Sequence, residues 1–219
     1  MVSIPDWLSS WAPCSVHDPI ALLEFAARFK AASQAWQDAL IPVLRVYFEK
    51  PRSVIGWKGL INDPNLDGSF DIDQGLRQAR DCLVSVAELG LPAATEFLDT
   101  TFGQYYADLV SFGAIGARTV ESQVHRELAS GLSMPVGFKN STRGHIDVAV
   151  DAILSASHPH WFPSLTESGE PAVLESTGNP HAPHKIPIAF EFLKTSTPPV
   201  NKSPSAIRSG SRPKNDCPN

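Results

Sequence analysis

The sequence predicts an α/β fold in which the strands of a parallel sheet alternate with helices. Short apolar runs alternate with helical stripes from residue 7 to about residue 157. Each stripe lies between two strand candidates, which is typical of parallel βαβ units. Neither a GxGxxG loop nor a GxxxxGKS/T loop interrupts the series. A phosphate-binding loop of these two types is therefore not expected.

The first unit and the strand of the second are clear in the sequence. Strands are expected at residues 7–11, just before Cys14, and at residues 43–48. Asp18 suits an N-cap and Pro19 suits the first helical position, so a helix is expected to start there. Its inner face would hold Leu22, Phe25, Phe29 and Trp36.

The next helix is expected to open at Asp73 and to end before Gly90, which suits the C′ position after a helix. Its inner residues would be Leu76, Leu83 and Val86. Three further strands are expected at residues 92–98, 114–117 and 135–139, where short apolar runs lie between helical stripes.

The remaining helices lie between and after these strands. One is expected near residues 104–110, and one is expected to be capped by Thr119. The inner residues of the second would be Val120, Val124 and Leu128, and those of a last helix Ile146, Val150, Ile153 and Leu154. Residues 161–176 are expected to form a β-hairpin with the turn residues Glu167, Ser168 and Gly169.

These elements make about five βα units in about 160 residues, whereas a TIM barrel has eight units in about 250 residues. The sequence therefore predicts a partial (β/α)8 barrel. Because the strand at residues 135–139 would then be an open parallel edge, aggregation or cover by a partner chain is expected.

The composition divides the chain at about residue 178. Of 219 residues, 42% are hydrophobic, which is enough for one core. Residues 180–219 hold eight of the nineteen prolines and six Lys and Arg against two Asp and Glu, so residues 1–179 carry a formal charge of −9. A Pro-, Ser- and Lys-rich segment of this kind buries little apolar surface. We expect a barrel domain at residues 1–178 and a disordered tail at residues 179–219.

The composition also excludes several classes of protein. No apolar stretch approaches the roughly 18 residues of a membrane span, and the first residues do not read as a signal peptide. Three scattered cysteines do not suggest a disulfide framework and favour a reducing compartment, so a cytoplasmic protein is expected. The formal net charge of −5 argues against nucleic-acid binding.

Cationic side chains recur at the ends of the expected strands. They are Arg45, Lys50, Arg52, Lys58, Arg118 and Lys139. In an acidic domain, such a set implies anionic ligands, because Arg binds phosphate and carboxylate bidentately and Lys binds them as a point charge. The alternative, that these are solvated surface cations paired with nearby acids, stays open at this point.

Several long motifs resemble one enzyme family. They are residues 45–52 (RVYFEKPR), 56–70 (GWKGLINDPNLDGSF), 113–119 (GAIGART), 121–133 (ESQVHRELASGLS) and 135–140 (PVGFKN). Together they resemble type I 3-deoxy-7-phosphoheptulonate synthase, over roughly residues 13–178. The resemblance implies a metal-dependent TIM barrel transferase, found as homo-oligomers, that condenses phosphoenolpyruvate with erythrose 4-phosphate. This is the first step of the shikimate pathway of aromatic amino acid biosynthesis.

The resemblance also implies roles for single residues. For phosphoenolpyruvate, Arg45 and Lys50 would bind the carboxylate, Arg118 and Lys139 the phosphate, and Glu96 would order a water, with Lys50 also the catalytic proton donor. Arg52 would bind the phosphate of erythrose 4-phosphate beside Ser53, where the family usually has Thr. Cys14 would be a ligand of a divalent metal of the Mn, Fe, Co or Zn class. A possible aromatic amino acid inhibitor pocket would comprise Gln104, Leu132, Ser133, Phe162 and Ser164.

The sequence departs from the family after Asn179, where the family's later strands bring a His, a Glu and an Asp that complete the metal site. We expect little turnover from this chain alone, because one metal ligand of four holds an ion poorly. Two hypotheses stay open: the enzyme itself, or a truncated, non-catalytic remnant that binds a phosphorylated ligand or a full-length homologue. Cys82, His17 and His125 are expected to be structural.

Overall fold

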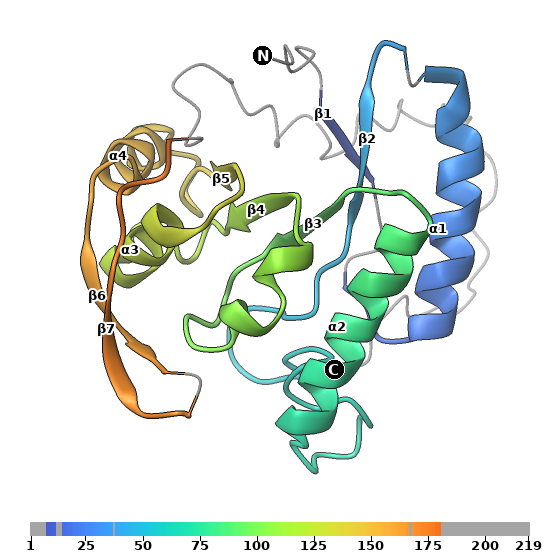
Figure 1. The fold of residues 1–219 in the computed structure, drawn as a ribbon, viewed down its shortest axis with the longest axis horizontal. Helices are drawn as coiled ribbons and strands as arrows, with labels where there is room; N and C mark the ends of the chain where they lie inside the picture. Colours follow the sequence, from blue (N-terminus) through green and yellow to red (C-terminus); the bar gives the residue numbers. More distant parts are fainter. Residues whose placement is uncertain (1–7, 12–14, 37, 167, 181–219) are drawn as a thin grey trace, which may run out of the picture.

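The structure, a computed structural model, describes residues 8–11, 15–36, 38–166 and 168–180. Its main sheet has five parallel strands in the order β1-β2-β3-β4-β5, and Figure 1 shows them in a curved wall. The strands are β1 (Leu8–Trp11), β2 (Ile41–Arg45), β3 (Ala93–Glu96), β4 (Phe112–Ile115) and β5 (Val136–Phe138). Each strand lies beside the next one in the chain, as in part of a barrel wall. The predicted α/β fold with about five βα units is confirmed.

Helices link the strands. They are α1 (Pro19–Ser33), α2 (Ile72–Glu88), α3 (Gln123–Gly131) and α4 (Asp147–Ala156), with the short 3₁₀ turns η1 (Gln34–Trp36), η2 (Gly103–Tyr105) and η3 (Ala107–Leu109). In Figure 1, α1 lies beside α2 and α3 lies beside α4, and both pairs are in contact. Within the described residues, β5 pairs with β4 and with no other strand.

Two helix starts can be compared directly with the sequence. Asp18 caps α1 as expected, because its Oδ1 accepts from the backbone N–H groups of Ile20 at 2.8 Å and Ala21 at 3.2 Å. The expected start at Asp73 is wrong, since Asp71 caps α2 and accepts from the N–H of Gln74 at 3.0 Å. Asp73 lies in the first turn, where its charge also favours the helix N-terminus.

The predicted C-terminal end is right for α2 and wrong for α1. Gly90 follows α2 with a φ of 72°, so the expected C′ glycine is confirmed. Trp36 does not lie on the inner face of α1, because α1 ends at Ser33 and Trp36 belongs to η1 with 58% of its surface exposed.

All four main-sheet strands after β1 end earlier than expected. β2, predicted at residues 43–48, ends at Arg45, and β3, predicted at residues 92–98, ends at Glu96. β4, predicted at residues 114–117, ends at Ile115, and β5, predicted at residues 135–139, ends at Phe138. The chain after β2 stays extended and buried, and the N–H of Val46 still donates to the Ala94 carbonyl at 2.7 Å. Because the residues after Arg45 are buried as well, the apolar run in the sequence extends beyond the end of the strand.

Two helix predictions between β3 and α3 are wrong. Residues 104–110 form η2 and η3, because the N–H of Tyr106 bonds to Gly103 and that of Val110 to Ala107, both at a spacing of three residues. Thr119 does not cap α3, which has Ser122 at its N-cap position. The Thr119 hydroxyl donates instead to the Gly116 carbonyl at 3.2 Å, inside a series of turns.

The inner face of α4 also differs from the prediction. Ile153 packs against the core as expected. Ile146, Val150 and Leu154 are 67%, 57% and 58% exposed, whereas Ala149, Ala152 and Ala156 are buried. The alanine face lies toward the core, where small side chains let α4 pack close to its neighbours. The larger apolar side chains suggested the opposite face because apolar residues occur on both sides of this helix.

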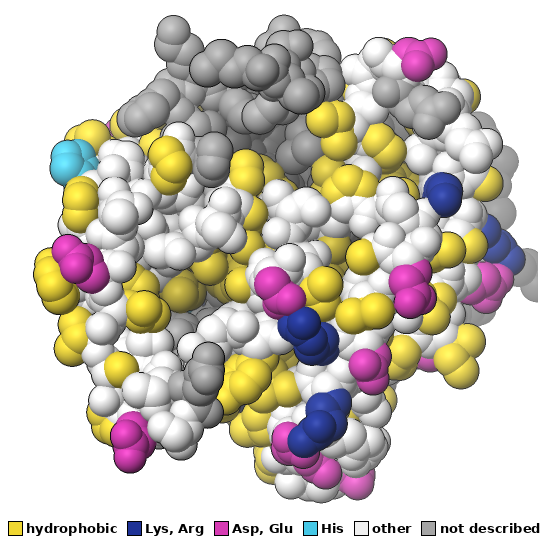
Figure 2. Space-filling model, viewed as in Figure 1, with side chains coloured by type: hydrophobic (Ala, Val, Ile, Leu, Met, Phe, Trp, Pro, Cys, Tyr) yellow, Lys and Arg dark blue, Asp and Glu magenta, His cyan; other side chains and the backbone are white. Residues whose placement is uncertain are grey.

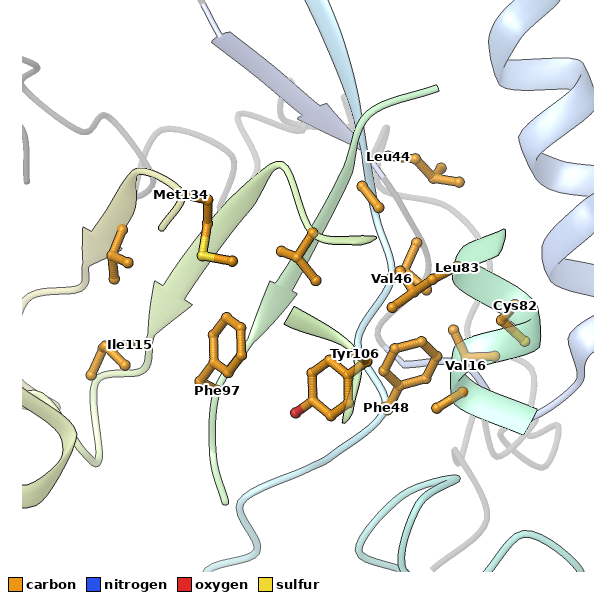
Figure 3. Packing of buried hydrophobic residues seen from close by; sticks show 14 of the residues in the cluster. Val16, Leu44, Val46, Phe48, Cys82, Leu83, Phe97, Tyr106, Ile115 and Met134 are labelled. Atoms are coloured by element: carbon orange, nitrogen blue, oxygen red, sulfur yellow. The ribbon is translucent and has the colours of Figure 1, made fainter. Parts of the chain in front are cut away.

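The core lies between the sheet and its helices, as Figure 3 shows. Phe97, Tyr106 and Phe48 form a row of rings, with centroids 5.8 Å apart for the first pair and 6.1 Å for the second. Cys82 of α2 is buried in the same cluster, and burial raises the pKa of its thiol to about 11. The thiol is therefore inert and structural, as expected.

The predicted hairpin is present as β6 (Trp161–Leu165) and β7 (Pro171–Glu175), which pair antiparallel. The chain after it is anchored to α3, because the hydroxyls of Ser176 and Ser130 lie 2.6 Å apart. The buried side-chain amide of Asn179 donates to the carbonyls of Ala129, Leu132 and Met134, each at 3.1 Å. From residue 181 onward, the expected tail lies outside the described residues.

The face shown in Figure 2 carries Lys and Arg interspersed with Asp and Glu near α2, and hydrophobic side chains over the hairpin. Two exposed ion pairs of α2 are Arg77 with Asp73 at 3.0 Å and Arg80 with Asp108 at 2.8 Å. Exposed pairs of opposite sign add little stability and form no patch of one charge. In the described residues, no helix is both long enough and apolar enough to cross a membrane.

Candidate functional site

The expected substrate-binding residues gather at the carboxyl ends of the parallel strands. Arg45 ends β2 and Glu96 ends β3, while Arg118 follows β4 and Lys139 directly follows β5. The register of the ladders brings these ends to one edge of the sheet, because Arg45 pairs with Ala94 and Glu96 pairs with Ala114. This edge is where parallel α/β folds build their ligand sites.

A buried tyrosine holds two of the cations together. The Arg45 guanidinium lies 3.8 Å from the centroid of the Tyr47 ring, and Lys139 Nζ lies 5.5 Å from the same centroid. Both distances allow a cation–π interaction, which favours a cation over the face of an aromatic ring. Tyr47 is only 3% exposed, so the ring is a fixed support for both cations.

Lys139 also pairs with a carboxylate inside this group. Its Nζ lies 3.5 Å from Glu96 Oε2, and the two side chains are 27% and 8% exposed. Burial lowers the pKa of Lys139, Glu96 opposes that shift, and the charges of Arg45 and Lys50 add to it. Two further cations thus act on one lysine, so an incoming anion is favoured electrostatically here.

The Glu96 carboxylate lies against a glycine at the end of the next strand. A Cβ atom built on Gly116 would overlap Glu96 Oε1, so no larger residue fits at position 116 without moving the carboxylate. The glycine lies in the GAIGART motif. The motif therefore has a physical role: it lets the Glu96 carboxylate lie directly against the backbone after β4.

A second group of polar side chains lies in the loop between β2 and α2. Arg52 Nε donates to the Trp57 carbonyl at 2.7 Å, and this bond orients the guanidinium group. Arg118 Nη2 donates to Ser53 Oγ at 3.2 Å, so the end of β4 meets this loop. Ser53 and Arg118 are both exposed and accessible to a ligand.

The other cations that the sequence indicated behave differently. Lys50 is half-buried, and its backbone N–H donates to the Lys58 carbonyl at 2.7 Å. Lys58 itself is exposed. The structure thus brings Arg45, Lys50, Glu96 and Lys139 into one electrostatic group and joins Ser53 to Arg118.

A metal centre cannot be built from the described side chains. Cys14 lies outside the described residues. In the part of the chain that the structure describes, no three His, Cys, Asp or Glu residues lie close enough together to hold an ion. These residues alone therefore do not fit the divalent metal that the family resemblance implies.

A separate cavity of about 320 Å³ lies between α3 and the hairpin. Its lining residues are Ser130, Gly131, Leu132, Ser133, Phe162, Leu174, Glu175, Ser176, Thr177, Gly178 and Pro180. The cavity thus unites three residues of the expected inhibitor pocket: Leu132, Ser133 and Phe162. Gln104, exposed on η2, and Ser164 are not in this lining.

Two site residues escaped the sequence reasoning. Tyr47 lies two residues after Arg45 in an extended segment, and this spacing places both on one side of the chain. Glu49 is 5% exposed and follows the same alternation, and burial raises the pKa of its carboxyl to about 7. The signal that could have revealed both is the alternation itself, continued past the end of the strand.

Comparisons with known proteins identify the family of this chain. The sequence pattern of the DAHP synthetase I family matches residues 11–209. The Tyr-sensitive phospho-2-dehydro-3-deoxyheptonate aldolase of Salmonella typhimurium is 55% identical over 177 residues, which are 81% of this chain and 50% of that protein. The Phe-sensitive enzyme of Escherichia coli K12 is 60% identical over 167 residues, 76% of this chain and 48% of that protein.

A solved structure supports the same relationship. The phospho-2-dehydro-3-deoxyheptonate aldolase of Francisella tularensis is 54% identical and superimposes with a TM-score of 0.77, over 80% of this chain and 51% of that one. The chain spans about half the length of the curated relatives it matches. On the strength of the sequence match and the shared fold, this chain belongs to the DAHP synthetase I family.

Proposed function

We propose that this chain is the phosphoenolpyruvate-binding part of a 3-deoxy-7-phosphoheptulonate synthase. The whole enzyme would condense phosphoenolpyruvate with erythrose 4-phosphate, the first step of the shikimate pathway. The observation that carries the proposal is the group formed by Arg45, Tyr47, Glu96 and Lys139 at the carboxyl edge of the sheet. It combines two cations with one carboxylate and so suits a small, multiply charged anion.

The cations divide the work between the two ends of phosphoenolpyruvate. We assign its carboxylate to Arg45 and Lys50 and its phosphate to Arg118 and Lys139. The planar guanidinium fork of Arg45 matches a carboxylate. Burial lowers the pKa of Lys139 in the ligand-free site, and a phosphate bound beside it would raise that pKa again, so the anion favours the charged form of the lysine.

The proposed chemistry joins C3 of phosphoenolpyruvate to the aldehyde carbon of the sugar phosphate, while water adds to C2 and phosphate leaves. Glu96 lies beside Lys139 and close to the backbone at Gly116, a position from which its carboxylate can order that water. Lys50 is the candidate proton donor, because it is half-buried at the same edge.

The phosphate of erythrose 4-phosphate is assigned to Arg52 and Ser53. Arg52 Nε is already engaged by the Trp57 carbonyl, which fixes its direction and leaves the two terminal nitrogens to bind an anion. The Ser53 hydroxyl accepts from Arg118 at 3.2 Å. Arg118 therefore stands between the two proposed phosphate positions and offsets the repulsion between them.

Four further assignments belong to the proposal. Cys14 would be one ligand of a divalent metal, which in the family supplies Lewis-acid chemistry. The chain would act in the cytoplasm and as a homo-oligomer. The domain, expected from the composition to end at residue 178, would extend through Pro180, because the Asn179 side chain is buried and bonds to three backbone carbonyls. Residues 181–219 would be a disordered tail.

The cavity beside the hairpin is proposed as an aromatic amino acid pocket. Phe162 and Leu132 would contact a side chain, and Ser133 would contact polar groups. The names of the relatives, which include Tyr-, Trp- and Phe-sensitive enzymes, support an inhibitor of this class. We expect phenylalanine, tyrosine or tryptophan to protect these residues in hydrogen exchange.

Calorimetric titration with three anions tests the proposed function. Phosphoenolpyruvate should bind more tightly than pyruvate and than inorganic phosphate by about tenfold or more, because only phosphoenolpyruvate engages both halves of the cation group. Equal affinity for phosphoenolpyruvate and inorganic phosphate would contradict the assignment and indicate a general phosphate site.

A further inference from the structure

One buried acid, Glu49, lies at the edge of the proposed site without contacting the proposed ligand. Glu49 is 5% exposed and lies between the loop after β2 and the loop after β3. Buried carboxylates cost stability unless they bond to donors, so their positions are seldom accidental. The question is what this carboxylate holds.

The backbone of Glu49 is fixed from one side. It forms an isolated bridge with Gly59, and the N–H of Lys50 donates to the Lys58 carbonyl at 2.7 Å. Gly59 has a φ of 125°, and a Cβ there would collide with the backbone of Phe48 and Glu49. The glycine therefore allows the two segments to lie against each other, and Glu49 has little freedom to shift.

The side chain of Glu49 reaches the other loop. Its Oε2 accepts from the backbone N–H of Asp99 at 3.2 Å. Asp99 in turn accepts through Oδ1 from the N–H groups of Thr101 at 2.7 Å and Phe102 at 2.8 Å. The Glu49 carboxylate thus holds Asp99, the first residue of a turn that the Asp99 side chain closes.

The neighbouring residue of the same loop is held from the opposite direction. His125 Nε2 lies 2.9 Å from the Leu98 carbonyl, and its Nδ1 lies 2.8 Å from Ser122 Oγ. A carbonyl only accepts, so Nε2 is the donor, and a neutral ring then accepts from the serine hydroxyl. The backbone of this loop is therefore bonded to α3 through the Leu98 carbonyl and to Glu49 through the Asp99 N–H.

We propose that Glu49 is a positioning residue of the phosphoenolpyruvate site. By holding the backbone of Asp99, it fixes the segment that leaves β3 three residues after Glu96, and it links that segment to the segment that carries Lys50. The inference rests on the proposed function for what is positioned, since Glu49 does not touch the ligand in this account. Its electrostatic neighbours are Glu96, Asp99 and Tyr106.

Three variants separate reach from charge. Glu49→Gln keeps an acceptor oxygen at the same reach, Glu49→Asp keeps the charge but is one methylene shorter, and Glu49→Ala removes both. Glu88→Gln, at an exposed position on α2, is the matched control. Each full-length protein is examined by amide hydrogen exchange without ligand and by calorimetric titration with phosphoenolpyruvate.

We expect the effects to depend on whether an oxygen of residue 49 can still accept from the Asp99 N–H. The Asp99 amide should exchange about tenfold faster in Glu49→Ala and Glu49→Asp, and the Kd for phosphoenolpyruvate should rise about five- to tenfold. Glu49→Gln and the control should stay within about twofold of wild type in both measurements. Should Glu49→Ala fail to fold, the contrast between Glu49→Asp and Glu49→Gln decides the matter.

Two results would overturn the inference. Unchanged Asp99 exchange in Glu49→Asp would show that the hydrogen bond does not hold the loop. Faster exchange with unchanged affinity would show that the loop does not position the site. If wild type itself fails to bind phosphoenolpyruvate, the proposed function fails, while exchange in the ligand-free protein still reports whether Glu49 holds Asp99.

Discussion

Lys139 Nζ lies 3.5 Å from Glu96 Oε2, although 43 residues separate the two in the sequence. They meet because β3 and β5 flank β4 in the sheet, so the residue that ends β3 and the residue that follows β5 lie on either side of one strand end. The carboxylate of this pair is 8% exposed. The pair is therefore built by the parallel topology and is only partly screened by water.

Lys139→Met tests this pair. The change removes the cation and leaves Glu96 buried beside the other charges, so the free energy of unfolding should fall by about 1–3 kcal/mol. Affinity for phosphoenolpyruvate should fall at least tenfold. Urea denaturation and calorimetry provide the two values. Adding Glu96→Gln should recover part of the stability but none of the affinity, and full recovery of both would contradict the pairing.

Gly116→Ala tests the close packing of Glu96 after β4. The added methyl group would displace the carboxylate, so we expect a loss of about 1–3 kcal/mol in the free energy of unfolding and weaker binding of phosphoenolpyruvate. Gly68→Ala is the comparison, because its Cβ would meet nothing within 4 Å and only its φ of 76° opposes the change. That variant should lose about 1 kcal/mol and keep its affinity; equal affinities in both variants would refute the role of Gly116.

Glu49 predicts a pH dependence of stability. Burial raises its pKa in the folded protein to about 7 from 4.5, so between these values the folded state holds the proton more firmly than the unfolded state. Stability contributed by the protonated form is present below about pH 4.5 and is lost as the pH rises to about 7, by up to about 1.4 kcal/mol per pH unit. The charge lowers global stability even while it strengthens the local bond to Asp99.

Denaturation at several pH values from 4.5 to 7.5 measures this effect. Glu49→Gln should flatten the decline, since an amide does not titrate in this range. Glu88→Gln should keep the wild-type slope because that carboxyl is exposed. A wild-type slope in Glu49→Gln would mean that other groups cause the decline.

The inner face of α4 is tested by two substitutions. Ala152 has no exposed surface, so Ala152→Leu should overpack the core and lower the free energy of unfolding by about 1–3 kcal/mol. Leu154 is 58% exposed, so Leu154→Ser should change the free energy of unfolding by no more than about 0.5 kcal/mol. A larger loss of stability in Leu154→Ser than in Ala152→Leu, measured by thermal or urea denaturation, would show that Leu154 lies on the inner face, as the apolar pattern predicted.

The alternation of strands and helices could be predicted because each element has its own period. The cap at Asp18 and the glycine at position 90 were also predictable, since both depend on local backbone chemistry. The ends of β2 and β4 were not, because residues beyond the paired strand, such as Phe48, stay buried. The face of α4 was missed because alanines, which weigh little in an apolar pattern, make the contact.

Part of the candidate site could be predicted from cations placed at strand ends. Parallel topology brings Arg45, Lys50 and Lys139 within electrostatic range of one another. Tyr47 and Glu49 were missed because their roles depend on burial and on contacts with segments far away in the sequence. Gln104 and Ser164 were matched by resemblance, and the cavity that holds Phe162 does not include them.

The most direct test of the central claim is the affinity of the intact chain for phosphoenolpyruvate with and without Arg45. Calorimetric titration should give one site in wild type and at least a tenfold weaker site in Arg45→Ala, because the guanidinium over Tyr47 is assigned to the carboxylate. Arg28→Ala, on the exposed face of α1, should bind like wild type. Equal binding by wild type and Arg45→Ala would contradict the claim that this strand-end group forms the substrate site.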